Sequence, residues 1–208
     1  MLIQIALDRM TEKEAFSILD MVAEEIDVIE IGTGVIKQYG MSIVKKIKNQ
    51  YPNILLFADM KTCDAGESEA IQAFQAGADI TSCMAFSSVS TIEKVLQTAT
   101  KYDKEVMIDL LGVQDVEKIN DLYGIGCRYF CLHIGIDEQK ESINPLSNLY
   151  DVMTNLKSCK IAVAGGITPS SLSNLDFSLI NIVIVGSAIT KSTNPLNVVQ
   201  CIKRKISN

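Results

Sequence analysis

The chain has 208 residues, of which 48% are hydrophobic and 21% charged, and its formal net charge at pH 7 is −6. This length supports one well-buried domain, residues 1–208, and the acidic balance excludes nucleic acid as the main partner, because phosphate backbones select basic faces. No apolar run reaches the ~18 residues that cross a membrane, and no basic segment with an apolar core opens the chain. We therefore expect a globular cytoplasmic protein without a membrane partner.

The cysteines show no paired C-x-x-C spacing of the kind that binds zinc or exchanges disulfides. There are six of them, at positions 63, 83, 127, 131, 159 and 201. Four lie within apolar runs, where an unpaired cysteine behaves as a small core residue. We predict buried free thiols in a reducing compartment, and we expect Cys63 to be a packed small residue.

Short β-branched runs alternate with amphipathic helical stretches from one end of the chain to the other. In the first half, the runs predict strands at 2–7, 28–31, 54–61 and 80–85. Of the helices that follow them, the first is predicted to end at about residue 25 and the second at about residue 49. The third and fourth are predicted at about 67–76 and 90–101. Thr11 and Glu14 have the spacing of a capping box, which marks the start of the first helix.

The second half repeats the pattern, with strands predicted at 106–111, 129–134, 161–164 and 182–185. Helices are predicted from near 113 to 123–126, at about 145–156, briefly after Pro169, and at 195–206. Eight such units in 208 residues leave about 26 residues each, which requires short connections. The pattern predicts an α/β fold, a (β/α)₈ TIM barrel in a single domain. A doubly wound open sheet is the alternative, but the first strand–helix turn lacks its glycine fingerprint.

Charged and polar residues fall at or near the ends of five predicted strands. They are Asp8, Glu30, Asp59, Lys61, Asp109 and His133. A helix cap or a loop charge would explain any one of them, but six at corresponding positions indicate a shared site. In a (β/α)₈ barrel the carboxyl ends of the strands meet on one face, where the active site lies.

The segment 57–67, FADMKTCDAGE, leaves an apolar run and then carries three charged residues within six: Asp59, Lys61 and Asp64. Asp59 and Lys61 are two apart, so on an extended backbone they point to the same side. They can share a ligand, a metal or each other, although a surface ion pair fits the spacing equally well. Gly66 is expected to let the chain turn before the next helix.

Glu30 and Asp59 come from neighbouring strands and are expected to lie a few ångströms apart. Two such carboxylates need a cation between them or a raised pKa. Magnesium fits, because it takes hard oxygen ligands from one or two carboxylates together with water and substrate. His133 is the only histidine, and a side chain that titrates near neutrality suits proton transfer at a sugar carbon.

Glycine-containing turns close the seventh and eighth predicted strands. Gly165 and Gly166 follow one strand, and Gly186 and Ser187 follow the other. In many barrels these two loops hold a phosphate through backbone amides, and glycine lets the backbone come close to the oxygens. Together with the residues above, they predict a phosphorylated, hydroxyl-rich substrate and a metal-stabilised oxyanion.

These residues resemble the 3-hexulose-6-phosphate synthase family, within the orotidine 5′-monophosphate decarboxylase suprafamily, over essentially the whole chain. The D-x-K-x-x-D element at Asp59, Lys61 and Asp64 is typical of the suprafamily, and the H-x-G-x-D-E-Q string at 133–139 is more specific to the synthase. The other matching segments are QIALD, DVIEIGT, AGAD, IDLLGV, VAGGI and VGSAIT.

The resemblance implies a reversible aldol condensation of formaldehyde with D-ribulose 5-phosphate, giving D-arabino-3-hexulose 6-phosphate. It implies that Glu30 and Asp59 bind Mg²⁺, with Mn²⁺ also possible, and that Lys61 stabilises an enediolate. His133 would move the proton at carbon one, and Asp8 would hydrogen-bond the substrate. The resemblance further implies that Asp109 lines the floor of the site. It also implies a homodimer in which Asp64 of the partner subunit completes each site.

The alternative function is that of 3-keto-L-gulonate 6-phosphate decarboxylase, a relative that shares the metal pair and the D-x-K-x-x-D element. That relative typically has arginine where this chain has Ile136, glutamate at the position of Asp109, and Gly-Arg where this chain has Gly186 and Ser187. These departures favour the synthase. A non-catalytic sugar-phosphate binder is disfavoured, because both metal carboxylates and Lys61 are present. An epimerase-like barrel is disfavoured too, because that chemistry uses several metal-binding histidines.

Overall fold

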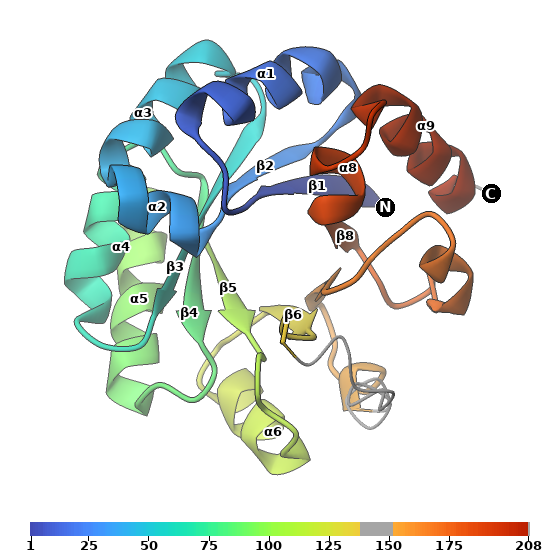
Figure 1. Cartoon of the computed structure of the whole chain (residues 1–208). Coiled ribbons are helices and arrows are strands. Elements are labelled where there is room, and N and C mark those ends of the chain that lie inside the picture. The colour runs from blue at the N-terminus through green and yellow to red at the C-terminus, as the bar shows by residue number, and fades with distance from the viewer. Residues whose placement is uncertain (138–151, 208) are drawn as a thin grey trace.

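The strands of this computed structural model, which describes residues 1–137 and 152–207, form a closed parallel barrel (Figure 1). Each strand pairs with the next in sequence, and Leu2 of the first strand lies opposite Ile182 of the last, which closes the barrel. The strands are β1 Leu2–Leu7, β2 Val28–Ile31, β3 Leu55–Thr62, β4 Ile80–Met84, β5 Glu105–Asp109, β6 Tyr129–His133, β7 Lys160–Ala164 and β8 Ile182–Val185. The predicted (β/α)₈ fold is confirmed.

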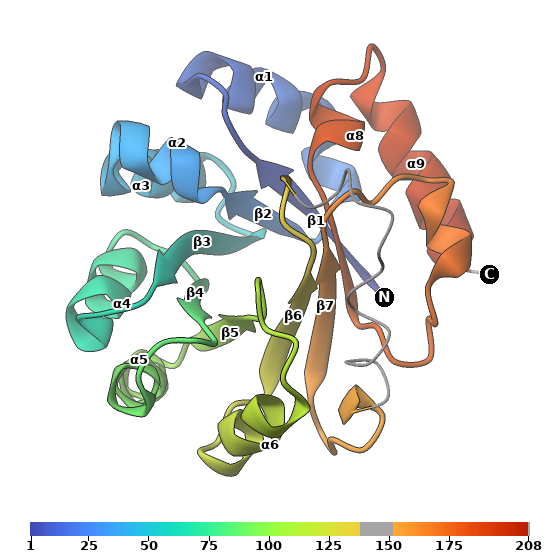
Figure 2. The same ribbon diagram turned by 60° about the horizontal axis from the view of Figure 1, so that its bottom comes forward.

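Helices surround the barrel, and Figure 2 shows α3, α4, α5 and α6 following one another around one side, with α9 on the other. The described helices are α1 Glu12–Val22, η1 Ala23–Glu25, α2 Thr33–Tyr39, α3 Met41–Gln50, α4 Gly66–Gln75, α5 Val89–Tyr102, α6 Val116–Gly124, η3 Ser171–Asn174, α8 Ser187–Thr190 and α9 Pro195–Ile206. The helix predicted at about 145–156 lies mostly outside the described residues, and residues 152–153 are helical. No helix in the described ranges is long and apolar enough to cross a bilayer.

Two local predictions about the helices were wrong. The predicted second helix is interrupted at Gly40, whose φ of 64° breaks it into α2 and α3. The turn before α4 is made by Ala65, with a φ of 51°, rather than by Gly66. Gly66 serves close packing instead, because a Cβ there would lie 2.4 Å from the carbonyl oxygen of Thr91 on α5. The capping box of Thr11 is present as predicted.

Side chains alternate between the two faces of the barrel wall, as strand geometry requires. Outward residues such as Ile5, Ile29 and Val183 pack in the main core cluster, together with buried residues of the helices. A second apolar cluster fills the inside, and it includes Val28, Phe57, Ile80, Met107 and Ile182. Two residues further along their strands, the same inward direction is taken by Glu30, Asp59, Ser82 and Asp109. The barrel interior is therefore apolar toward the amino ends of the strands and polar toward their carboxyl ends.

The six cysteines are all free thiols, but only three are buried. Cys83, Cys127 and Cys131 lie in the core as predicted. Cys63 is exposed, and Cys159 and Cys201 are partly exposed, so the prediction of buried thiols was wrong for these three. Cys63 directly follows β3, where the chain has left the barrel wall and neither face is covered.

Candidate active site

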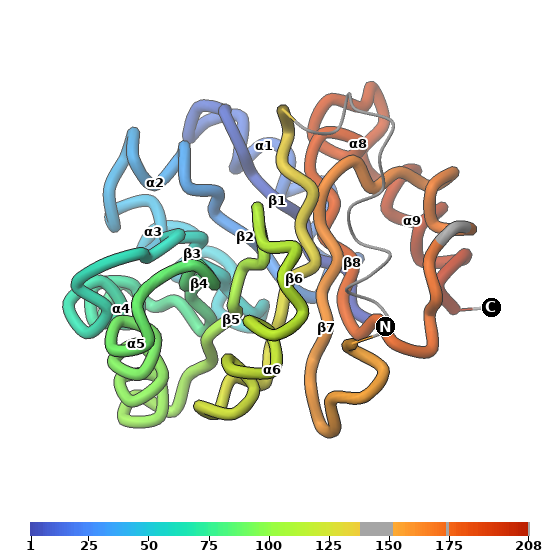
Figure 3. Tube along the Cα trace, turned by 90° about the horizontal axis from the view of Figure 1, so that it is seen from below, coloured from blue at the N-terminus to red at the C-terminus, as the bar shows by residue number. Residues whose placement is uncertain are grey.

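A cavity of about 330 Å³ opens at the carboxyl ends of the strands. Figure 3 shows α8, which follows β8, at the end of the barrel opposite the N-terminus. Ten of the eleven predicted site residues line the cavity: Asp8, Glu30, Asp59, Lys61, Asp109, His133, Gly165, Gly166, Gly186 and Ser187. The eleventh, Asp64, is exposed and does not line it. Distant parts of the chain thus converge on one polar pocket, as the fold predicted.

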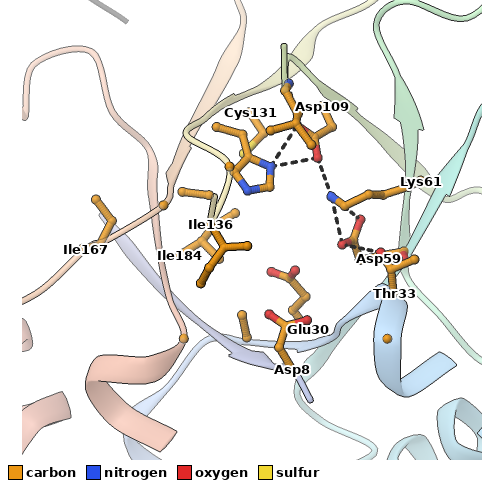
Figure 4. A pocket seen from close by; sticks show the side chains of 18 of the residues that line it. Asp8, Glu30, Thr33, Asp59, Lys61, Asp109, Cys131, Ile136, Ile167 and Ile184 are labelled. Atoms are coloured by element: carbon orange, nitrogen blue, oxygen red, sulfur yellow. Dashed lines mark hydrogen bonds and ion pairs between the residues drawn. The ribbon is translucent and has the colours of Figure 1, made fainter. Parts of the chain in front are cut away.

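The Asp59 carboxylate and the Lys61 ammonium lie next to each other at the wall of the pocket (Figure 4), with Lys61 Nζ 3.1 Å from Asp59 Oδ2. The sequence left this contact open as one of several alternatives, and it assumed an extended backbone, which is not observed. β3 is not regular there, because its register with β4 shifts between Ala58 and Thr62. Lys61 has a φ of 48°, a left-handed conformation that is uncommon outside glycine. The contact is therefore made on a β-bulge, a feature that often re-aims side chains next to active sites.

Asp109, at the end of β5, joins Lys61 to His133. Its Oδ2 lies 2.6 Å from Lys61 Nζ, and His133 Nδ1 lies 3.0 Å from both carboxylate oxygens. Burial opposes the ionisation of Asp109, but the hydrogen bond and charge of His133 and the charge of Lys61 outweigh it and lower its pKa to about 2. Asp109 is consequently ionised at neutral pH.

The ionised state of Asp109 determines the tautomer of His133. A carboxylate can only accept hydrogen bonds, so His133 Nδ1 must carry the proton that is shared with Asp109. In the neutral imidazole this leaves the lone pair on Nε2. Since His133 lines the cavity, the geometry makes it a base whose orientation is held by a buried carboxylate.

Lys61 is held as a cation by the two carboxylates beside it. Burial lowers its pKa, but the charges of Asp59 and Asp109 more than compensate, and the net pKa is raised above the usual lysine value. The Lys61 side chain is 26% exposed. The result is a fixed positive charge at the wall of the cavity, which can stabilise an oxyanion.

Glu30 and Asp8 point into the same space (Figure 4). Burial, followed by the charges of Asp59 and Asp8, raises the pKa of Glu30 well above its ordinary value. The pKa of Asp8 is also raised, by burial and then by the charge of Asp59. The amide of Gln4 donates to Glu30 Oε2 at 2.6 Å. Crowded carboxylates of this kind are relieved by a cation or by protonation.

The residues present fit a magnesium ion. Among the described residues, no three His, Cys, Asp or Glu side chains converge on one point. Glu30 and Asp59, which both line the cavity, would supply two carboxylate ligands, and water and substrate oxygens would complete the shell of a magnesium ion.

Several polar residues around the pocket were missed in the sequence. Thr33 Oγ1 lies 2.8 Å from the backbone oxygen of Asp59 and 2.9 Å from its Oδ2. Ser82, on β4, donates to Asp59 Oδ1 at 2.7 Å. Arg9 lines the cavity beside Asp8. Ser82 could have been found from the sequence, because it lies two residues after the inward-facing Ile80 and so points to the same side of β4. Thr33 and Arg9 lie beyond the ends of their strands, where side chains no longer alternate regularly between the two faces.

The glycine turns after β7 and β8 differ in what they require. Gly165 has a φ of 101°, and a Cβ there would lie 2.2 Å from the carbonyl oxygen of Ile134, so only glycine fits. A Cβ on Gly186 would meet nothing closer than 3.6 Å. The backbone of both turns faces the cavity. A phosphate held there would be recognised by backbone amides, as in other barrels of this class.

The chain belongs to the orotidine 5′-phosphate decarboxylase / HUMPS family, whose family model matches residues 1–202. A 3-hexulose-6-phosphate synthase of Staphylococcus aureus (strain USA300) is 33% identical over 195 residues, which cover 93% of each chain.

Solved structures show the same relationship. The 3-hexulose-6-phosphate synthase of Salmonella typhimurium is 32% identical with a TM-score of 0.95, over 100% of this chain and 99% of that one. The 3-keto-L-gulonate-6-phosphate decarboxylase of Vibrio cholerae is 26% identical with a TM-score of 0.88, over 99% and 97%. The chain is thus similar to both enzymes and shares more identity with the synthases.

Proposed function

We propose that this chain is an aldehyde-lyase that condenses formaldehyde with D-ribulose 5-phosphate to D-arabino-3-hexulose 6-phosphate, reversibly. The observation that carries the proposal is the Asp109 carboxylate, which holds the Lys61 ammonium on one side and His133 Nδ1 on the other. This places a base and a cation at one wall of the cavity. A base to remove a proton next to a carbonyl and a cation to stabilise the resulting oxyanion are the two groups that the first step needs.

The reaction begins with binding of the sugar phosphate, its phosphate at the backbone of the turns after β7 and β8. Arg9, two residues beyond the end of β1, adds positive charge to the cavity lining, and β1 is the strand next to β8. Asp8 accepts a hydrogen bond from a sugar hydroxyl. When bound by Glu30 and Asp59, Mg²⁺ or Mn²⁺ supplies positive charge to the sugar oxygens.

His133 Nε2 then takes the proton from carbon one, and the Lys61 charge stabilises the enediolate. Carbon one attacks the formaldehyde carbon, so a carbon–carbon bond forms as the C=O π electrons move to the formaldehyde oxygen. The carbonyl at carbon two re-forms, and the formaldehyde oxygen takes up the proton held on His133 Nε2, which restores the neutral imidazole. No oxidant or reductant is required, and the same steps in reverse release formaldehyde.

The direct test is to incubate the purified protein with D-ribulose 5-phosphate, formaldehyde and magnesium, and to follow formaldehyde with and without a chelator. We expect metal-dependent consumption that is abolished in Asp59→Ala, because this change removes a proposed metal ligand and a Lys61 partner. Constant formaldehyde together with carbon dioxide release from 3-keto-L-gulonate 6-phosphate would move the assignment to the decarboxylase.

Ile136 supports the synthase over the decarboxylase. It lines the cavity and is 49% exposed. The resemblance described above implies that the decarboxylase typically has arginine at this position. In Figure 4 the apolar side chain of Ile136 lies at the pocket across from Lys61. A pocket with isoleucine there has no guanidinium to deliver a proton after decarboxylation. The glutamate and glutamine of the H-x-G-x-D-E-Q string, at positions 138 and 139, lie outside the described residues.

The proposal includes a cytoplasmic homodimer in which Asp64 of the partner subunit completes each site. In support, Asp64 is exposed, accepts a hydrogen bond from the Ala65 backbone N–H at 2.7 Å, and does not line its own cavity. Two large apolar side chains are also exposed: Phe86, two residues after β4, at 61%, and Val89, the first residue of α5, at 46%. The six free thiols are consistent with a reducing compartment.

Mixing two inactive variants tests the shared site. Asp64→Asn and Lys61→Ala homodimers are each expected to be inactive, whereas a mixed dimer contains one intact site. Random re-association of equal amounts should restore roughly a quarter of the wild-type activity, because half the dimers are mixed and each has one working site of two. Activity that stays at the level of the separate variants would exclude a shared site.

A further inference from the structure

We propose that Ser82 is a positioning residue that holds Asp59 and Lys61 in their working arrangement. The inference rests on the proposed function only in taking Asp59 and Lys61 as the groups that act on the substrate. Ser82 lies on β4, is 0% exposed, and touches both of these residues.

Two hydrogen bonds meet at the Ser82 hydroxyl. The backbone N–H of Lys61 donates to Ser82 Oγ at 2.8 Å, and Ser82 Oγ donates to Asp59 Oδ1 at 2.7 Å. The Lys61 amide N–H can only donate, so the hydroxyl accepts from it with one of its lone pairs. The hydroxyl then donates its one proton to the Asp59 carboxylate.

The bulge in β3 explains why a side chain is needed here. Because the register with β4 shifts between Ala58 and Thr62, Lys61 stands where regular ladder bonding is interrupted. Its φ of 48° is a conformation that surrounding structure must hold in place. The Ser82 hydroxyl accepts the backbone hydrogen bond of Lys61 and so supports the bulge that aims the ammonium at Asp59 and Asp109.

Asp59 is held from two sides. Thr33 Oγ1, at the start of α2, shares its one proton between the Asp59 backbone oxygen at 2.8 Å and Oδ2 at 2.9 Å, and Ser82 on β4 donates to Oδ1 at 2.7 Å. Hydrogen bonds to both oxygens fix the plane of the carboxylate. That plane determines how Asp59 meets Lys61 and how it faces Glu30, so loss of Ser82 disturbs the cation and the proposed metal ligand together.

The test compares Ser82→Ala, Ser82→Thr and a matched control, Thr81→Val. Thr81 is the preceding residue on β4, is also 0% exposed, and donates its hydroxyl to the backbone oxygen of Ala58 on the outer face of the barrel. Each of Ser82→Ala and Thr81→Val removes one buried hydroxyl from the same strand. Only the former removes a contact to the pocket.

We expect Ser82→Ala to lower kcat about 10- to 100-fold with little change in KM, and to weaken magnesium binding to the substrate-free protein in calorimetry by a similar factor. Ser82→Thr, which keeps the hydroxyl, should retain most of the wild-type kcat and most of the wild-type magnesium affinity. Thr81→Val should lower the unfolding temperature but keep kcat. Wild-type kcat in Ser82→Ala, or an equal loss in Thr81→Val, would overturn the proposal.

Hydrogen exchange of the Lys61 amide separates this inference from the function itself. The amide should exchange at least about tenfold faster in Ser82→Ala than in Thr81→Val, since it loses its acceptor. Failure of the wild type to consume formaldehyde would reject the proposed function, while the exchange rates would still decide the role of Ser82. If Ser82→Ala does not fold, Ser82→Cys takes its place, because its thiol is a weaker donor and acceptor; unchanged exchange there overturns the proposal.

Discussion

Lys61→Ala is expected to lower kcat/KM for D-ribulose 5-phosphate by about 10³-fold. The ammonium is held in advance by Asp59 at 3.1 Å and Asp109 at 2.6 Å, so its charge is in place before the enediolate forms. Its removal also leaves two buried carboxylates facing an anionic substrate. Steady-state kinetics with circular dichroism and thermal unfolding would measure the effect.

Lys104→Ala is the matched control. Lys104 Nζ lies 2.6 Å from Asp79 Oδ1, and its side chain is 30% exposed, close to the 26% of Lys61. Neither Lys104 nor Asp79 lines the active-site cavity. Lys104→Ala should therefore reduce stability while retaining kcat/KM. Lys61→Ala activity above about a tenth of wild type, in a folded protein, would remove Lys61 from the mechanism.

His133→Asn is expected to lower kcat by about 10²- to 10⁴-fold, the range for loss of a general base, with a small change in KM. Asparagine keeps an N–H that can donate to Asp109 but offers no basic nitrogen. The sharpest measurement omits formaldehyde and follows deuterium uptake at carbon one of D-ribulose 5-phosphate in D₂O. The wild type should exchange this proton, and His133→Asn should not.

Asp109→Asn tests the tautomer argument for the same step. An amide at this position can donate to His133 Nδ1, which moves the imidazole proton to Nε2 and removes the base. It also removes one of the two anions that hold Lys61. Deuterium uptake should therefore fall in this variant as well. Exchange at the wild-type rate in either variant would show that another group takes the proton.

The sequence by itself determined the fold and the candidate residues. Strands β1, β2 and β8 begin and end where the apolar runs predicted, because a barrel strand is buried on both faces and reads as a continuous apolar run. The same strand predictions placed Glu30, Asp59 and Asp109 at or near the ends of their strands. The regular alternation of strand and helix then implied that their ends meet. These features are local in sequence, so no tertiary contact is needed to see them.

How these residues work together depends on contacts between distant parts of the chain. The bulge at Lys61 depends on pairing with β4. Asp59 is hydrogen-bonded by Thr33, 26 residues away along the chain, and by Ser82, 23 residues away. Asp109 joins Lys61, 48 residues before it, to His133, 24 residues after it. Hydroxyls in strands are common, and nothing in their local sequence marks their partners. Closure of the barrel brings these groups together, and their contacts orient the His133 imidazole and the Lys61 ammonium.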